Sequence, residues 1–314
     1  MGVSTLQRLL ESGTFVVTAE VGPPKGADPD VVRHAARAMC GAVDAINCTD
    51  NQTAVVRMSS IATAALVQQA GVEAVVQMTV RDRNRIALQS DILGLAALGI
   101  RNVVCMSGDH PCNGNHPAAK AVYDLDSITW LQTVARMTGE GVFQCGEAIK
   151  SPPVLFIGAV ENPFAPPYDY RLVRVAKKID AGARFIQTQC VFDLDYLRRF
   201  MDGLASMGLL ERVKIIVGIT PLKSAKMARH MQTNVPGLQL PEAVARRMEA
   251  ATDAKAEGIA IAAETIQAVR EIPGVAGIHL MPVLWEDVVP HIVASANLLP
   301  RPSTPESAAV TATE

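Results

Sequence analysis

The sequence predicts an α/β fold, a single-domain (β/α)8 or TIM barrel, on three observations. Eight short runs rich in β-branched residues alternate with longer segments whose apolar residues recur three and four positions apart, as in parallel βαβ units. No GxGxxG follows the first run and no GxxxxGK[ST] occurs, so the sequence lacks the nucleotide-binding fingerprints. The 314 residues fit one barrel or two small domains, and the eight repeats favour the barrel.

The expected elements follow one another in a regular order. Asp28 followed by Pro29 is typical of a helix start, with an aspartate cap and a proline at the first helical position. Asp193 precedes a second helix that begins near Leu194. The segment 235–273 is long enough for two helices before the last strand. The expected strands are 15–20, 43–48, 72–79, 102–107, 154–160, 184–189, 213–218 and 275–281.

Two connections, 108–124 and 161–168, are longer than the others and follow the fourth and fifth strands. Both leave the carboxyl ends of strands, the edge that builds the active site of a barrel. We expect the barrel to occupy residues 1–300. The remaining segment, 301–314, is small, polar and proline-containing, which predicts a disordered tail.

Composition and charge indicate a soluble protein with a small ligand. No apolar run approaches the ~20 residues of a membrane-spanning helix, and the first residues do not resemble a secretory signal, so we expect a cytoplasmic location. The net charge of −2 gives no reason to expect a nucleic acid or an anionic membrane as partner.

The six cysteines form no CxxC pair and are interpreted as free thiols in a reducing compartment. Cys112 differs because it lies in a polar stretch with His110 and His116. These three side chains could hold a metal, but three potential ligands in one loop without a fourth favour no metal site.

Polar residues stand where the apolar strands end, and in a barrel such residues point into the active site. Glu20 stands out because it is a carboxylate in the apolar strand FVVTAEV, where burial makes its ionised form costly. A carboxyl group that keeps its proton suits a general acid. The full set is Glu20, Thr49, Asp50, Gln77, Thr79, Ser107, Gly108, Asp109, Glu161, Asn162 and Gln189.

Three of these residues also have a purely structural interpretation. Glu20 could cap a backbone amide, Asp109 could cap a turn or helix after Gly108, and Gln189 could be a core amide satisfied by neighbouring strands. The basic run Arg81, Arg83 and Arg85 is either a solvated helix start or a phosphate clamp.

On these motifs the chain resembles the methylenetetrahydrofolate reductase family from about residue 13 to 298. Five segments match in the family's order, and they contain the strand ends singled out above. They are TAEVGPP (18–24), QMTVRDRN (77–84), ALGIRNVVCMSGD (97–109), KKIDAGARFIQTQCVFD (177–193) and IIVGITPL (215–222).

The resemblance implies a flavin across the mouth of the barrel, FAD with FMN as the alternative, that is reduced and then reoxidised by the folate in a ping-pong cycle. Glu20 matches the general acid that protonates the leaving nitrogen of 5,10-methylenetetrahydrofolate. Asp109 matches a carboxylate that stabilises the developing cation and tunes the flavin.

The resemblance also assigns binding residues. Thr49 and Gln189 match positions that contact the pterin, and a lysine at 177 or 178 would partner the flavin diphosphate. The flavin contacts it implies are Thr49, Asp50, Gln77, Ser107, Gly108, Asp109, Tyr123, Asn162, Lys177 and Lys178.

The chain departs from the family's pattern at four positions near the expected flavin. Gln77 stands where many members carry histidine, Ser107 where many carry arginine, and Asp50 where an aromatic residue is common. Arg171 falls near a position often occupied by an acidic residue. Losing one charge-assisted hydrogen bond would weaken flavin binding by about 1.5–3 kcal/mol unless another group replaces it.

The chain resembles the short, single-barrel type of this family from anaerobes. The resemblance leaves two electron donors open, NADH or an electron-donating partner subunit, and implies a homo- or hetero-oligomer. Two other functions stay open: a pterin-dependent methyltransferase barrel, which needs no flavin, and a flavin-binding subunit that relays electrons in a larger complex.

Overall fold

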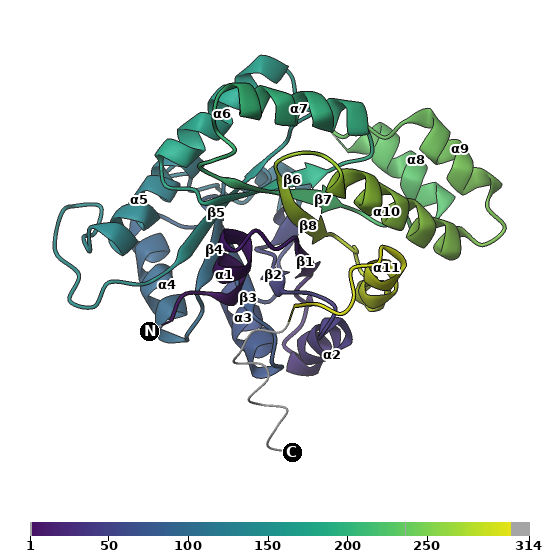
Figure 1. Cartoon of the computed structure of the whole chain (residues 1–314). Coiled ribbons are helices and arrows are strands. Elements are labelled where there is room, and N and C mark those ends of the chain that lie inside the picture. Colours follow the sequence, from purple (N-terminus) through teal and green to yellow (C-terminus); the bar gives the residue numbers. More distant parts are fainter. Residues whose placement is uncertain (1, 236, 303–314) are drawn as a thin grey trace.

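Eight parallel strands close into a barrel in the computed structural model of the chain, with helices packed around the outside (Figure 1). The structure describes residues 2–235 and 237–302. Each strand pairs with its successor, and β8 pairs with β1, which confirms the predicted (β/α)8 fold. The strands are β1 (Val16–Val21), β2 (Ala45–Cys48), β3 (Ala74–Thr79), β4 (Asn102–Met106), β5 (Phe156–Glu161), β6 (Phe185–Cys190), β7 (Lys214–Ile219) and β8 (Val275–Leu280).

Every expected strand is present, and the helices alternate with the strands as predicted. The α-helices are α1 (Thr5–Glu11), α2 (Pro29–Met39), α3 (Ser60–Gln69), α4 (Arg85–Ala97), α5 (Ser127–Gly139), α6 (Tyr168–Asp180), α7 (Leu194–Ser206), α8 (Ala225–Asn234), α9 (Glu242–Ala250), α10 (Ala254–Arg270) and α11 (Val289–Ser295). Short 3-10 helices are η1 (Gln52–Ala54), η2 (Pro111–Asn113) and η3 (Glu286–Val288).

Both predicted helix starts are confirmed by their capping bonds. The Asp28 side chain accepts a hydrogen bond from the Asp30 amide, with Pro29 at the first helical position. Asp193 accepts from the amides of Asp195 and Tyr196 at the start of α7. The segment before the last strand contains α9 and α10, as its length predicted.

Helix α1 lies across the amino-terminal end of the barrel and fills its interior. Leu6 and Leu10 are buried among barrel-lining side chains, including Phe156 and Phe185, whose rings stack with centroids 4.9 Å apart. The Glu73 carboxylate before β3 accepts hydrogen bonds from the first amides of α1. Because the strands are parallel, their polar carboxyl ends all lie at the opposite mouth of the barrel, which α1 leaves uncovered.

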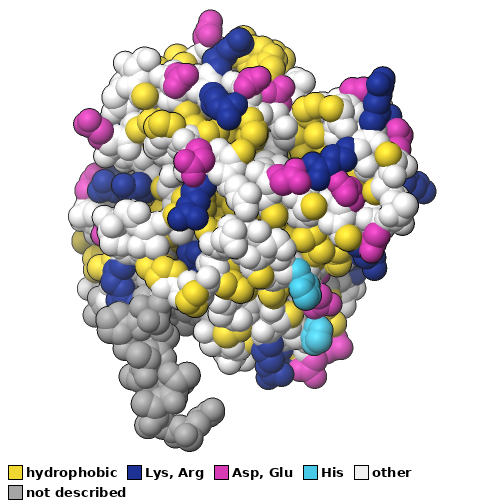
Figure 2. All heavy atoms as spheres, turned by 45° about the vertical axis from the view of Figure 1, so that its right-hand side comes forward, with side chains coloured by type: hydrophobic (Ala, Val, Ile, Leu, Met, Phe, Trp, Pro, Cys, Tyr) yellow, Lys and Arg dark blue, Asp and Glu magenta, His cyan; other side chains and the backbone are white. Residues whose placement is uncertain are grey.

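The α8–α9 hairpin projects from the barrel on the right of Figure 1. Arg229 holds the two helices together through paired hydrogen bonds to Glu242 and Glu249. Basic and acidic side chains are interspersed over this side of the molecule (Figure 2). Among the described residues, no helix combines the length and apolarity needed to cross a membrane.

The segment after α11 returns to the start of the barrel. Arg301, with its side chain 8% exposed, donates to both carboxylate oxygens of Asp44 and to the Phe15 carbonyl. Asp44 also accepts the Val17 amide at 2.7 Å. Arg301, the first residue of the expected tail, therefore contacts the barrel, while residues 303–314 lie outside the described part of the chain.

Candidate functional site

The carboxyl ends of the strands surround a cavity of about 410 Å³. It lies where a TIM barrel builds its active site. A larger cavity of about 730 Å³ lies at the amino ends of β5 and β6, and none of the predicted site residues lines it. The predicted catalytic and binding residues that line the smaller cavity are Glu20, Gln77, Ser107, Gly108, Asp109, Asn162, Lys178 and Gln189, and the strand-end residue Glu161 lines it as well.

Glu20 and Asp109 both line this cavity, Glu20 from β1 and Asp109 from the loop after β4. Glu20 is 8% exposed near the end of β1, and its carboxylate lies near His279, with Nε2 and Oε2 separated by 3.8 Å. Asp109 follows β4 and accepts the Thr53 amide at 3.1 Å through Oδ2. The structure thus brings together the two carboxyl groups that the sequence selected independently.

A wall of basic side chains closes one side of the cavity. Arg171, Arg174 and Lys178 project from one face of α6, because residues three and seven positions apart lie on the same helix face. All three surround the buried Glu161 carboxylate, with Lys178 Nζ 2.7 Å from Oε2 and the guanidinium nitrogens of Arg171 and Arg174 at 3.4 and 3.5 Å.

This wall carries more positive than negative charge, since three basic groups share one carboxylate. Burial lowers the pKa of Lys178, whereas the adjacent Glu161 favours its charged form. Nε of Arg174 is buried and has no hydrogen-bond partner within the described chain. The wall can therefore accept a further anionic group.

The register of β6 shifts between Gln187 and Cys190, and the shift shapes the floor of the cavity. Gln187, Thr188 and Gln189 all line the cavity although they are consecutive. Gln189 Oε1 accepts the Cys190 amide at 3.1 Å. Gln187 pairs inside the barrel with Asn47, so the satisfied core amide is Gln187.

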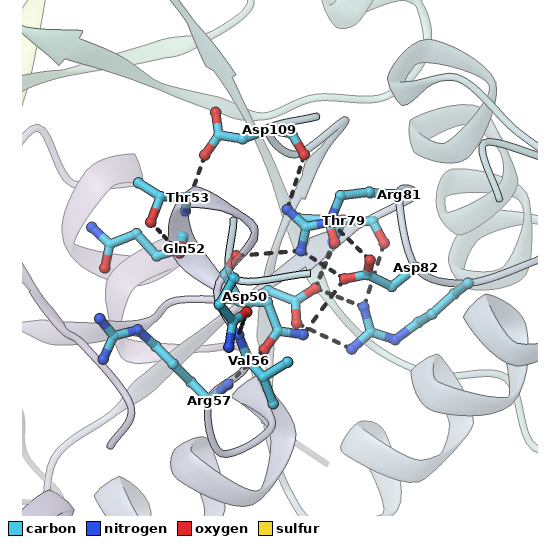
Figure 3. A network of polar contacts seen from close by, with 12 residues as sticks. Asp50, Gln52, Thr53, Val56, Arg57, Thr79, Arg81, Asp82 and Asp109 are labelled. Atoms are coloured by element: carbon cyan, nitrogen blue, oxygen red, sulfur yellow. Dashed lines mark hydrogen bonds and ion pairs between the residues drawn. The ribbon is translucent and has the colours of Figure 1, made fainter. Parts of the chain in front are cut away.

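The basic run after β3 forms ion pairs, and only Arg85, the first residue of α4 with its side chain 48% exposed, matches the solvated helix start that the sequence suggested. Arg81, 2% exposed, binds Asp82 and also donates to the backbone carbonyls of Asn51 and Asp109 (Figure 3). Arg81 thereby joins the loops that follow β2, β3 and β4. Arg83 pairs with Asp50 and Asp91, and Arg85 pairs with Asp124.

Four predicted site residues do not line the cavity. Asp50 is buried and accepts from Thr79 and from both Arg83 Nη atoms. Thr49 is 2% exposed, and its hydroxyl has no hydrogen-bond partner among the described residues. Tyr123 is 40% exposed on the long loop. Lys177 is exposed, with Nζ 5.9 Å from the centre of the Tyr170 ring.

The loop with His110, Cys112 and His116 does not assemble a metal site. The His110 ring caps η2 by accepting the Cys112 amide at 3.2 Å. Within residues 2–235 and 237–302, no group of three His, Cys, Asp or Glu side chains could hold a metal ion. All six cysteines are free thiols, and burial raises the pKa of Cys105, which lines the candidate cavity.

Sequence reasoning missed several residues of the cavity, and three of them, His279, Arg171 and Arg174, are titratable. His279 of β8 lines the cavity but was hidden within an apolar strand. Arg171 was noted only as a departure from a family pattern, and Arg174 was not considered. The spacing of Arg171, Arg174 and Lys178 on a helix that follows a barrel strand could have found the basic wall.

Fold and site together define a (β/α)8-barrel protein in which carboxyl groups and basic side chains converge on one cavity at the strands' carboxyl ends. A family model described as methylenetetrahydrofolate reductase matches residues 5–297. The chain belongs to the methylenetetrahydrofolate reductase family.

Individual relatives are more distant. The "5,10-methylenetetrahydrofolate reductase" of Pectobacterium carotovorum subsp. carotovorum is 30% identical over 166 residues, 53% of this chain and 49% of that protein. The "Probable methylenetetrahydrofolate reductase (NADPH)" of Caenorhabditis elegans is 25% identical over 199 residues, 63% of this chain and 28% of that protein. The chain thus spans about half the length, or less, of these curated relatives.

One solved structure is similar over nearly the whole chain. It is an uncharacterised protein from Clostridium thermocellum that binds two copies of 5-methyl-5,6,7,8-tetrahydrofolic acid. The TM-score is 0.62 at 14% identity, and the match covers 94% of this chain and 99% of the other. At this identity the similarity supports the fold.

Proposed function

We propose that this chain reduces 5,10-methylenetetrahydrofolate to 5-methyltetrahydrofolate with the help of a bound flavin. The observation that carries the proposal is that Glu20 and Asp109 line one cavity at the barrel mouth. Membership of the methylenetetrahydrofolate reductase family supports the same reaction. The folate bound by the Clostridium thermocellum protein is consistent with a pterin site in this type of barrel.

The residues present fit a flavin, FAD or alternatively FMN. The basic wall of Arg171, Arg174 and Lys178 offers charge for a phosphate or diphosphate, and Nε of Arg174, which ion-pairs with Glu161 at 3.5 Å, makes no hydrogen bond among the described residues. Gly108 presents a bare backbone to the cavity. When bound, the flavin would supply the hydride that the carbon of the methylene bridge accepts.

The side chains of the cavity supply the proton chemistry. In the proposed reaction the Glu20 carboxyl group transfers its proton to the folate nitrogen that leaves the methylene bridge, so an N–H bond forms as the C–N bond breaks. The product is an iminium ion, and the Asp109 carboxylate stabilises its positive charge. Gln189, which lines the cavity, would orient the pterin by hydrogen bonds through its side chain.

The electron donor is either NADH or an electron-donating partner subunit. Purified protein mixed with NADH and an artificial acceptor, alone and with candidate partner proteins, distinguishes these two sources. A donor that reduces the protein before the folate reacts gives ping-pong kinetics, with parallel lines in double-reciprocal plots.

The first experiment follows the flavin absorbance of the purified, reconstituted protein in a stopped-flow instrument. Reductant should bleach it, and 5,10-methylenetetrahydrofolate should restore it with formation of 5-methyltetrahydrofolate. Glu20→Gln should still be bleached but recover at least ~100-fold more slowly, since a general acid contributes about 10²–10⁴-fold. Glu11→Gln, on the exposed surface of α1, is the matched control and should recover normally.

Other outcomes would replace the proposal. A protein that retains no flavin and passes a methyl group from methyltetrahydrofolate to a corrinoid is a pterin-dependent methyltransferase. A flavoprotein whose activity survives Glu20→Gln is an electron-relay subunit, because electron relay does not use this proton.

A further inference from the structure

His279 is a buried histidine for which the proposed reaction has so far no role. It lies on β8, with its side chain 4% exposed, and its ring stands between two side chains of β1. His279 Nδ1 is 3.0 Å from the Thr18 hydroxyl, and Nε2 is 3.8 Å from Glu20 Oε2. Thr18 and Glu20 present the same face of β1 because side chains alternate along a strand.

A chain of buried polar side chains continues behind His279 across the barrel interior. Gln187 Nε2 of β6 donates to Thr18 Oγ1 at 3.5 Å. Gln187 in turn pairs with Asn47 of β2 by two hydrogen bonds of 2.7 and 3.2 Å. Asn47, Gln187 and Thr18 are each at most 2% exposed. Buried amides and hydroxyls without bulk water hold one another in fixed orientations.

These contacts admit the tautomer of His279 that carries its proton on Nε2. Thr18 Oγ1 accepts from Gln187, and its own proton can go to His279 Nδ1 at 3.0 Å or to the Ile278 carbonyl at 3.3 Å. A neutral imidazole that accepts the Thr18 proton at Nδ1 carries its own proton on Nε2, the atom that faces Glu20.

We propose that His279 is a positioning residue for Glu20: the Nε2–H group aims the carboxyl group at the folate and stabilises the carboxylate that remains after proton transfer. The 3.8 Å separation exceeds a hydrogen bond, and a small rotation of the Glu20 side chain closes it as the proton leaves. This inference rests on the proposed reductase function.

The test compares variants that keep or remove each donor. His279→Leu removes the Nε2–H group, while His279→Gln retains an N–H donor of similar reach. Thr18→Val removes the hydroxyl with little change of shape, and Thr18→Ser keeps it. Each variant is measured for reduction of its flavin and, separately, for reoxidation of the flavin over a range of methylenetetrahydrofolate concentrations.

We expect His279→Leu to slow reoxidation at saturating folate by about 10- to 100-fold, the effect of losing one hydrogen bond to a charged group. The folate concentration at half-maximal rate and the rate of flavin reduction should stay near the parent values. His279→Gln should recover most of the lost rate. Thr18→Val should slow the same step, and Thr18→Ser should not.

Glu20→Gln in the same assay separates the two proposals. A His279→Leu variant that reoxidises at the parent rate while Glu20→Gln does not overturns the role of His279 and leaves the reductase function standing. A His279→Gln variant as slow as His279→Leu also overturns it, since packing alone would then explain the loss. If His279→Leu does not fold, the Thr18→Val and Thr18→Ser pair decides the question alone.

Discussion

Gly108 shows how a single residue fixes the place of Asp109, the carboxylate proposed to stabilise the iminium ion. Its φ of +82° lies in the left-handed region, and a Cβ atom there would come 2.9 Å from both Cβ and Cγ2 of Thr79. Thr79 is held by its hydrogen bonds to the buried Asp50 and cannot move away easily. Only glycine lets the chain pass close to β3 and deliver Asp109 to the cavity.

Gly108→Ala should therefore destabilise the protein and displace Asp109. Overpacking costs typically 1–3 kcal/mol, and an L residue with positive φ adds about 1–2 kcal/mol. Gly99→Ala is the matched control, because Gly99 has φ +83° but open space where its Cβ would lie. Urea unfolding of both variants should show a larger loss for Gly108→Ala, and equal losses would contradict the steric argument.

At the residue scale, the sequence predicted those site residues that can be recognised by their position at the end of a strand. Glu20 and Asp109 end strands, so their convergence followed from the barrel. His279 could not be found this way, because its partners Thr18 and Glu20 are about 260 positions away. Lys177 and Lys178 were indistinguishable in sequence, and only the rotation of α6 shows which of them faces the cavity.

At the scale of elements, the orientation of α6 places two adjacent lysines in different environments, one buried at the cavity and one exposed. Lys178 is 3% exposed beside Glu161, whereas Lys177 is on the exposed side near Tyr170. The alternation of strands and helices could be predicted because each element has its own periodicity. The side that a helix turns toward a cavity depends on its packing against neighbours.

Lys178→Met should weaken flavin binding, whereas Lys177→Met should not. Losing a hydrogen bond to a charged phosphate costs about 1.5–3 kcal/mol, roughly a 10- to 100-fold rise in the dissociation constant. Titration of the flavin-free protein with FAD and with FMN, followed by fluorescence quenching, measures the effect. An equal loss in both variants would mean that charge in general, and not the cavity wall, attracts the cofactor.

For the whole molecule, Asp44 and Arg301 connect the segment after the last helix to the first two strands. Asp44 precedes β2, receives an amide from β1 and binds Arg301 in a nearly buried pair. This pair could not be predicted from the sequence, because Arg301 stands at the start of a segment whose composition is typical of disorder. A charged side chain in such a segment acquires a defined partner only once the barrel has closed.

Arg301→Ala should destabilise the folded protein by about 3–5 kcal/mol, the cost of leaving one partner of a buried ion pair alone. Arg212→Ala removes the exposed pair with Asp180, which has the same 2.7 Å separation, and should cost only about 0–1 kcal/mol. Chemical denaturation at neutral pH measures both. A small effect of Arg301→Ala would show that barrel closure does not depend on this pair.

The row of hydrogen-bonded polar side chains from Asn47 to His279 consists of residues on β2, β6, β1 and β8. The pairing of β8 with β1 joins the first and last strands of the sheet. Under the roles proposed for Glu20 and His279, the acid and the group that aims it are therefore encoded near opposite ends of the sequence and meet only where the sheet closes on itself. A truncated chain that lacked β8 would keep every strand from β1 to β7 and, on this proposal, would be unable to direct the proton.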